Sequence, residues 1–157
     1  PVSVVRYFNA YGARLDPRGY GSVIARFITQ AIKNEPLTVY DDGEQTRCFT
    51  YVGDTVTGTI LAATRREAAG KVFNIGSDRE TTINDLAKLI IHLTDSSSEI
   101  VHLPPKSIYG PHFEETRRRV PDTLRAREVL GFVAKTSLEE GLQRTIAWFE
   151  ETQRAVV

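Results

Sequence analysis

The 157-residue chain lacks several features that would each place it in a particular class of protein. Cys48 is its single cysteine, which excludes an internal disulfide and a zinc site built from cysteines. Its 20 basic and 20 acidic residues balance, so no overall field attracts nucleic acid or an anionic membrane. It has no apolar run of the roughly 18 residues that a membrane helix needs, and no signal-peptide pattern at its start. These absences predict a cytoplasmic globular protein in which any anion site is local.

Motifs for binding a nucleotide cofactor and for catalysis are also missing. The sequence has no G-x-G-x-x-G, G-x-x-G-x-x-G or G-x-x-x-x-G-K-[ST] run, and Gly19-Tyr20-Gly21 is too short to replace one. None of the six tyrosines has a lysine four residues later. His92, His102 and His112 have no carboxylate pattern beside them, so we expect ordinary histidines and no metal site. The chain therefore offers no catalytic residue of its own.

The pattern of the residues that are present indicates an α/β protein. Apolar runs rich in Val, Ile, Phe and Tyr alternate with segments whose apolar residues recur every three or four positions. The predicted strands are 2–8, 37–40, 47–52, 71–76 and 100–103, with 37–40 and 47–52 able to pair as a hairpin. The predicted helices begin at Ser22, Asp54, Thr82, Asp122 and Ser137, each a possible N-cap, and a loop of about 15 residues that contains 116–119 precedes Asp122.

The first strand ends in a polar residue, Asn9. In open α/β sheets, ligands bind in the crevice beyond the carboxyl ends of the strands. Asn9 is therefore a candidate ligand contact. A buried parallel strand needs neighbours on both sides, and nothing precedes this one, so we expect the chain to begin within a domain.

Two groups of arginines are candidate anion sites. Arg47 follows an acidic turn and begins a strand, and its planar fork suits bidentate contacts with phosphate. The alternative is an ion pair with Glu44. Arg117, Arg118 and Arg119 form a local basic cluster, which could equally be a solvated face. If both groups face the end of the first strand, their donors would surround a diphosphate.

Six segments stand out as motifs, and together they span nearly the whole chain. They are Arg6-Tyr7-Phe8-Asn9-Ala10-Tyr11-Gly12, Glu35-Pro36-Leu37-Thr38-Val39-Tyr40, Asp42-Gly43-Glu44-Gln45-Thr46-Arg47 with its continuation to Asp54, Val72-Phe73-Asn74-Ile75-Gly76, Arg119-Val120-Pro121-Asp122 with 126–131, and Ser137-Leu138-Glu139-Glu140-Gly141-Leu142. In this order they resemble the C-terminal half of extended short-chain dehydrogenase/reductases that modify nucleotide sugars: UDP-glucose 4-epimerases, dTDP-glucose 4,6-dehydratases and UDP-glucuronate decarboxylases.

The resemblance implies a role for each matching position. Asn9 would hold the sugar nucleotide near its diphosphate, Arg47 would grip the diphosphate, and Arg119 would be a second clamp for which Arg117 and Arg118 compete. The segment from Leu37 to Tyr40 would lie against the base. The implied substrate-binding residues are Asn9, Val23, Leu37, Val39, Tyr40, Arg47, Arg117 and Arg119, and those implied to pass the nicotinamide of NAD are Tyr7 and Phe8.

The resemblance also implies what the chain lacks. The family carries its glycine-rich loop and its Tyr-x-x-x-Lys pair in the N-terminal half, and neither is present. We therefore expect residues 1–16, joined by strand 71–76, to end a Rossmann domain, and residues 17–157 to form a small α/β substrate-binding domain. The implied protein is an NAD-dependent, homodimeric enzyme acting on a UDP- or dTDP-sugar, of which this chain alone is inactive.

One departure bears on the reaction. Decarboxylases of the family tend to carry Gly-Arg before the two valines of the substrate loop, whereas this chain reads Gly21-Ser22-Val23-Ile24. This favours a UDP-glucose 4-epimerase, with a dTDP-glucose 4,6-dehydratase or a UDP-glucuronate decarboxylase as alternatives. A fragment that binds a nucleotide without catalysis is the alternative from another class.

Overall fold

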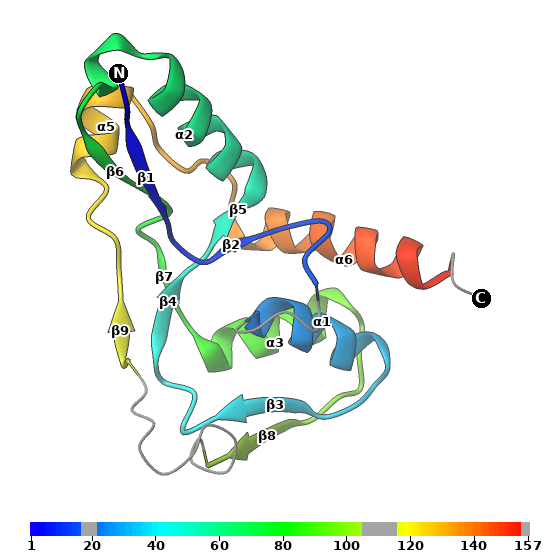
Figure 1. The fold of residues 1–157 in the computed structure, drawn as a ribbon. Helices are drawn as coiled ribbons and strands as arrows, with labels where there is room; N and C mark the ends of the chain where they lie inside the picture. The colour runs from blue at the N-terminus through cyan, green and yellow to red at the C-terminus, as the bar shows by residue number, and fades with distance from the viewer. Residues whose placement is uncertain (17–21, 105–115, 155–157) are drawn as a thin grey trace.

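The computed structural model describes residues 1–16, 22–104 and 116–154 (Figure 1). His112 and the Gly19-Tyr20-Gly21 segment lie outside these ranges. The strands are β1 (Val4–Tyr7), β2 (Ala10–Tyr11), β3 (Leu37–Tyr40), β4 (Thr46–Cys48), β5 (Thr50–Tyr51), β6 (Val72–Ile75), β7 (Glu80–Thr82), β8 (Ile100–Leu103) and β9 (Arg118–Arg119). The helices are α1 (Val23–Ile32), α2 (Val52–Thr64), the short 3-10 helix η1 (Arg66–Ala68), α3 (Ile83–Leu93), α5 (Leu124–Leu130) and α6 (Leu138–Arg154).

The first apolar core lies in the upper half of Figure 1, where α2 and α5 pack on the parallel pair of β1 and β6. Its fully buried members include Phe73 and Ile75 of β6 and Leu130 of α5. Strands 2–8 and 71–76 were both assigned to the end of a Rossmann domain, and they lie side by side, paired in the register Val4↔Val72 to Tyr7↔Ile75. The α/β fold class is also confirmed.

A second core occupies the lower half, where α1 and α3 pack between β3 and α6 (Figure 1). Phe27, Ile28, Leu37 and Leu86 are completely buried there. The predicted caps of two of these helices are confirmed. Ser22 Oγ accepts from Ala25 N at 3.3 Å, and Thr82 Oγ1 accepts from Asp85 N at 3.0 Å. Short polar side chains satisfy main-chain donors that the first helical turn leaves unpaired.

The predicted hairpin of 37–40 and 47–52 is wrong. β3 pairs in parallel with β8, whereas β4 lies between β7 and β9 in a separate three-stranded sheet. The apolar side chains of β3 lie in the second core, and β8 is the strand that pairs with β3 there. The connection between β3 and β4 is closed by a side chain, because Gln45 Nε2 donates to Tyr40 O at 2.9 Å.

Two further predictions are wrong. Asp54 does not cap a helix: α2 begins two residues earlier, and the Asp54 carboxylate accepts from Thr136 N at 3.0 Å. The expected loop through 116–119 contains β9, which pairs in parallel with β4 and is anchored by Thr46 N donating to Arg117 O at 2.8 Å. A strand of two residues has too short a pattern to be predicted from sequence.

Candidate functional site

The end of β1 is fixed against β4 and β5 by Asn9. This residue has a positive φ of 41°, in the left-handed region that asparagine tolerates better than most residues. Its Nδ2 donates to Cys48 O at 2.9 Å, and its own carbonyl accepts from Thr50 N at 3.2 Å. The Asn9 side chain is therefore bonded to the residue that follows Arg47 in β4.

The hydroxyl of Thr50, next to Asn9, joins three segments of the chain. Its hydroxyl donates to Phe8 O at 2.8 Å and accepts from Ser77 N at 3.0 Å, and the side chain is 1% exposed. One buried hydroxyl thus holds the end of β1, the residues after β6 and the start of β5 together. The sequence shows only a threonine in a strand, so this junction was missed.

Arg47 and Arg119 occupy facing positions on β4 and β9. The register pairs them directly, and facing residues of neighbouring parallel strands lie about 4.8 Å apart with side chains on one face of the sheet. The Arg47 side chain is 8% exposed, and its Nη1 donates to Thr46 O at 2.8 Å and to Thr116 O at 2.7 Å. Glu44, the alternative partner, instead accepts from Asn84 Nδ2 at 2.7 Å.

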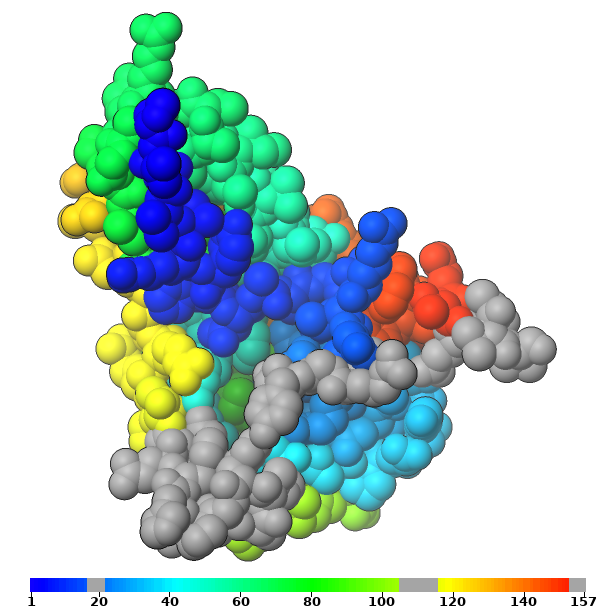
Figure 2. All heavy atoms as spheres, in the orientation of Figure 1, coloured from blue at the N-terminus to red at the C-terminus, as the bar shows by residue number. Residues whose placement is uncertain are grey.

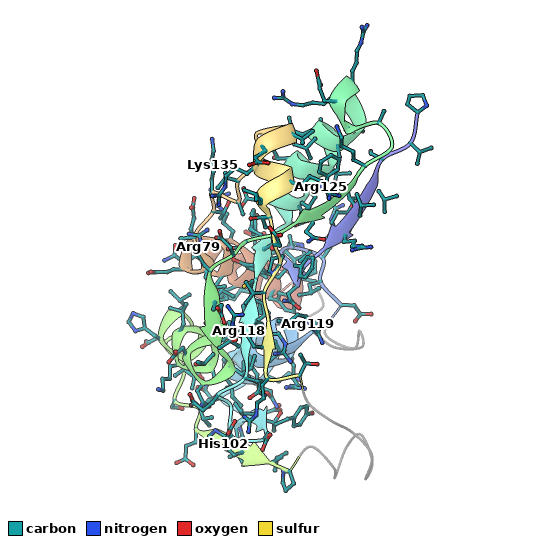
Figure 3. The ribbon with its side chains drawn as sticks, turned by 90° about the vertical axis from the view of Figure 1, so that its left-hand side faces the viewer. Arg79, His102, Arg118, Arg119, Arg125 and Lys135 are labelled. Atoms are coloured by element: carbon teal, nitrogen blue, oxygen red, sulfur yellow. The ribbon has the colours of Figure 1, made fainter. Side chains whose placement is uncertain are left out.

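Arg118 belongs to the opposite face of the same sheet. Figure 3 shows Arg118 and Arg119 on opposite sides of β9. Arg118 Nη2 donates to Glu80 Oε1 at 2.7 Å, and Thr46 Oγ1 donates to Glu80 Oε2 at 2.8 Å. These bonds from Arg118 and then Thr46 hold the pKa of Glu80 below its usual value. Arg118 therefore has a structural partner on the face away from Arg47.

Arg117 is held by the turn that follows β3. Its Nη1 donates to both carboxylate oxygens of Asp42, at 2.6 and 2.8 Å, and this pairing lowers the pKa of Asp42. Among the residues that the structure describes, Arg119 has no carboxylate within ion-pair distance. Of the three consecutive arginines, Arg119 is therefore the one that is exposed and lies directly beside Arg47.

The Arg118–Glu80 pair is expected to make stability depend on pH. Because the pKa of Glu80 is lowered by folding, the pair stabilises the fold above the ordinary glutamate pKa and loses this contribution as the pH falls through the folded value. Between about pH 5 and about pH 3, the wild-type chain should lose more stability than Glu80→Gln. Urea unfolding midpoints across this range measure the difference, and parallel curves for both proteins would contradict it.

The segment to which the resemblance assigns the base, β3, has both buried and partly exposed residues. Leu37 and Val39 are 0% exposed and lie in the second core, so only their main-chain atoms could reach a ligand. Tyr40 is partly exposed and is the last residue of the strand. Val23 is partly exposed at the first position of α1. The structure thus brings one aromatic side chain, rather than the whole segment, to the surface.

Three long polar side chains beside β3 were missed. Arg26 and Gln30 of α1 bond to Thr38, and Gln45 bonds to Tyr40. A signal for the first two was present, because polar residues four positions apart share one face of a helix. Nothing in the sequence indicated which strand that face would meet.

Tyr7 and Phe8 lie at the carboxyl end of β1, next to Asn9. The Tyr7 side chain is 52% exposed, and its Oη lies 3.1 Å from Thr59 Oγ1 of α2. Phe8 is half-buried, and its carbonyl is held by Thr50. Figure 2 shows β1 along the outer surface of the upper half, beside α2.

A family model described as "NAD dependent epimerase/dehydratase family" matches residues 1–76. A UDP-N-acetyl-alpha-D-glucosaminuronate decarboxylase from Bacillus cytotoxicus is 47% identical over 153 residues, which are 98% of this chain and 47% of that protein. The chain belongs to the NAD-dependent epimerase/dehydratase family. It spans about half the length of this relative.

Solved structures of the epimerase/dehydratase family have the same fold. A UDP-glucose 4-epimerase from Thermotoga maritima, with UDP-glucose, superposes with a TM-score of 0.86 at 38% identity, covering 96% of this chain and 46% of that one. A UDP-glucuronic acid 4-epimerase from Bacillus cereus, in complex with UDP-glucuronic acid and NAD, gives a TM-score of 0.84 at 29% identity, covering 97% and 46%. The resemblance stated from six short segments is confirmed at the level of the family.

Two titratable groups near the site are kept neutral by burial. Burial raises the pKa of the Cys48 thiol to about 11 and moves the pKa of Tyr11 well above its usual value. Tyr11 Oη donates to Leu138 O at 3.2 Å, and neither group is suited to abstract a proton. In the ranges that the structure describes, no three His, Cys, Asp or Glu residues form a metal cluster, and no helix is long and apolar enough to cross a membrane.

Proposed function

We propose that this chain is the nucleotide-sugar-binding part of an NAD-dependent UDP-sugar epimerase or decarboxylase. The observation that carries the proposal is the register of Arg47 and Arg119 on one face of β4 and β9, with Asn9 fixed one residue away. Two guanidinium groups on neighbouring strands suit the two phosphates of a nucleoside diphosphate. Asn9 would add an amide contact at the side from which the sugar extends.

The role of these residues is to position the sugar. A diphosphate held by fixed arginines leaves the attached sugar with little freedom, and such positioning is a large part of catalysis in two-substrate sites. Tyr7 and Phe8 would touch the nicotinamide ring of NAD, which when bound supplies the hydride chemistry. They fit one edge of the cofactor only, because the sequence has no glycine-rich loop for its phosphates.

An exposed apolar strip supports a further part of the proposal. Val2, Val4 and Tyr7 in and before β1 are 74%, 48% and 52% exposed, and Val56 and Ile60 of α2 are 51% and 55% exposed. We propose that the cofactor-binding half of the enzyme packs on this strip and completes the sheet around β1. The division at residues 16 and 17, the homodimer and the inactivity of the isolated chain remain predictions.

One observation favours an epimerase, and another favours a decarboxylase. The chain reads Gly21-Ser22 where the family's decarboxylases tend to have Gly-Arg, which favours an epimerase. The relative at 47% identity is named a decarboxylase of a UDP-linked uronic acid, which favours the second candidate. Both candidates require a UDP-sugar. The hypothesis of a binding fragment without catalysis shares this ligand, so ligand binding is the first test.

Isothermal titration calorimetry of this chain tests the proposal with UDP, UDP-glucose, UDP-glucuronic acid, dTDP-glucose and NAD. We expect UDP and the UDP-sugars to bind, NAD alone to bind weakly, and no epimerase or decarboxylase turnover. Failure of UDP to bind at millimolar concentration would contradict the proposed function. Turnover by the isolated chain would contradict the prediction that catalysis needs further residues.

A further inference from the structure

The turn of residues 41–45, between β3 and β4, is attached to the first residues of α3. Ile83 N donates to Gln45 O at 3.2 Å, and Asn84 N donates to Gly43 O at 3.1 Å. The first N–H groups of a helix have no partner within the helix, so here the carbonyls of the turn satisfy them. Because Ile83 is buried in the second core, the turn is attached to a fixed part of the fold.

The side chain of Asn84 strengthens this attachment. Its Nδ2 donates to Asp42 O at 2.9 Å and to Glu44 Oε1 at 2.7 Å. Its Oδ1 lies 3.0 Å from Nε2 of His102 in β8. Gly43 has a positive φ of 76° and lies so close to the Asn84 amide that a Cβ at this position would overlap it. Asn84 therefore holds the turn in one shape.

Both arginines that we assign to the diphosphate depend on this turn. Arg47 follows the turn by two residues and lies in β4. Arg119 depends on it through the start of β9, because Arg117 Nη1 donates to both carboxylate oxygens of Asp42, at 2.6 and 2.8 Å. The main chain makes a further link, from Thr46 N to Arg117 O at 2.8 Å. The turn therefore sets how the two guanidinium groups are placed relative to each other.

We propose that Asn84 is a positioning residue for the diphosphate, acting through the turn 41–45 on the spacing of Arg47 and Arg119. This inference rests on the proposed function. Two phosphates joined through one oxygen have a nearly fixed separation, so they bond to both arginines only if the strands hold the guanidinium groups at a matching distance. A single phosphate can bond to one arginine at any spacing. Asn84 therefore favours ligands with two phosphates over ligands with one.

The test compares UDP with UMP, which has the same base and ribose but one phosphate. Isothermal titration calorimetry measures both affinities for the wild-type chain, Asn84→Asp and Asn84→Ala. Aspartate has nearly the shape of asparagine, but an ionised carboxylate cannot donate to Asp42 O and repels Glu44. We expect each variant to weaken UDP binding by about three- to tenfold and UMP binding by less than about twofold, the effect of losing one or two hydrogen bonds that hold the turn.

Asn84→Asp also separates positioning from stability. An acidic side chain in the first turn of a helix is stabilising, so this change should not weaken α3, and it serves if Asn84→Ala does not fold. Lys88→Gln is the matched control. It lowers the net charge by one, as Asn84→Asp does, at an exposed position one turn further along the same helix. It should change the affinity for UDP and for UMP by less than about twofold.

Each other outcome decides the matter. Unchanged UDP binding by Asn84→Asp overturns the positioning role and leaves the proposed function intact. An equal loss of UDP and UMP affinity also overturns it, because a general disturbance of the fold would affect both ligands alike. If the wild-type chain binds neither ligand, the proposed function fails and the inference fails with it.

A double-mutant cycle with Arg119→Ala shows whether Asn84 acts on the spacing of the two arginines. Without Arg119 there is no second guanidinium group to place, so adding Asn84→Asp to Arg119→Ala should change UDP affinity by less than about twofold. Separate effects that multiply in the double variant would mean that Asn84 influences the ligand by another route, and would contradict the proposal.

Discussion

Replacing Arg47 with alanine is expected to weaken UDP binding by about 10- to 100-fold, the effect of losing one or two hydrogen bonds to a charged group. The side chain is 8% exposed, and the carbonyls of Thr46 and Thr116 fix its direction, so the guanidinium is held in place before any ligand arrives. A preorganised donor does not lose side-chain entropy on binding, which increases its contribution to affinity. Calorimetry with UDP measures the change.

Arg118→Ala is the matched control for this experiment. It removes an arginine from β9 at the position that faces Thr46, on the side of the sheet where Glu80 lies. UDP affinity should then change by less than about twofold, since surface charges contribute little on their own. Arg47→Lys keeps the charge but loses the planar fork and should lie between wild type and alanine. Equal affinities for wild type and Arg47→Ala, with both proteins folded, would exclude a diphosphate clamp at this position.

The local parts of the fold could be predicted from the sequence. The caps at Ser22 and Thr82 depend on residues three positions apart, and the two apolar runs at 2–8 and 71–76 indicated the strands that pair as β1 and β6. The pairing of β3 could not be predicted. Strand 37–40 could pair with 47–52 or with 100–103. The pairing that occurs is the one that lets Leu37 and Val39 enter the second core. It depends on contacts between residues about 60 positions apart in the chain, which the local pattern does not show.

Candidate site residues could be chosen from the sequence where a residue type carries its own chemistry. Arg47 and Asn9 were chosen in this way, and the structure bonds Asn9 to the residue that follows Arg47, while their contact with a ligand stays a prediction. The choice among three consecutive arginines was not predictable, because it depends on strand alternation in β9, and the sequence there indicated a loop. Once β9 pairs with β4, alternation separates Arg118 from Arg119. Arg26 was missed for a related reason: its contact with Tyr40 joins a helix and a strand, and only their packing shows that the two meet.

Thr50→Val is expected to lower the free energy of unfolding by about 2–4 kcal/mol, since a buried main-chain N–H and a partly buried main-chain carbonyl would each lose a hydrogen bond. The hydroxyl donates to Phe8 O at 2.8 Å and accepts from Ser77 N at 3.0 Å, and Thr50 is only 1% exposed. Valine has nearly the same shape, so no cavity adds to this loss. Urea unfolding followed by the fluorescence of the single tryptophan, Trp148, measures it.

Thr57→Val is the control for Thr50→Val, because it removes a threonine hydroxyl that bonds to Gly53 O at 2.9 Å on the exposed side of α2. Thr57→Val should lower the free energy of unfolding by less than about 0.5 kcal/mol, as surface substitutions usually do. A loss below about 1 kcal/mol for Thr50→Val would show that the junction is not a main support of the fold. Since Thr50 N also donates to Asn9 O, a destabilised junction should weaken UDP binding as well. Loss of stability with unchanged affinity would mean that Asn9 is held by Cys48 O alone.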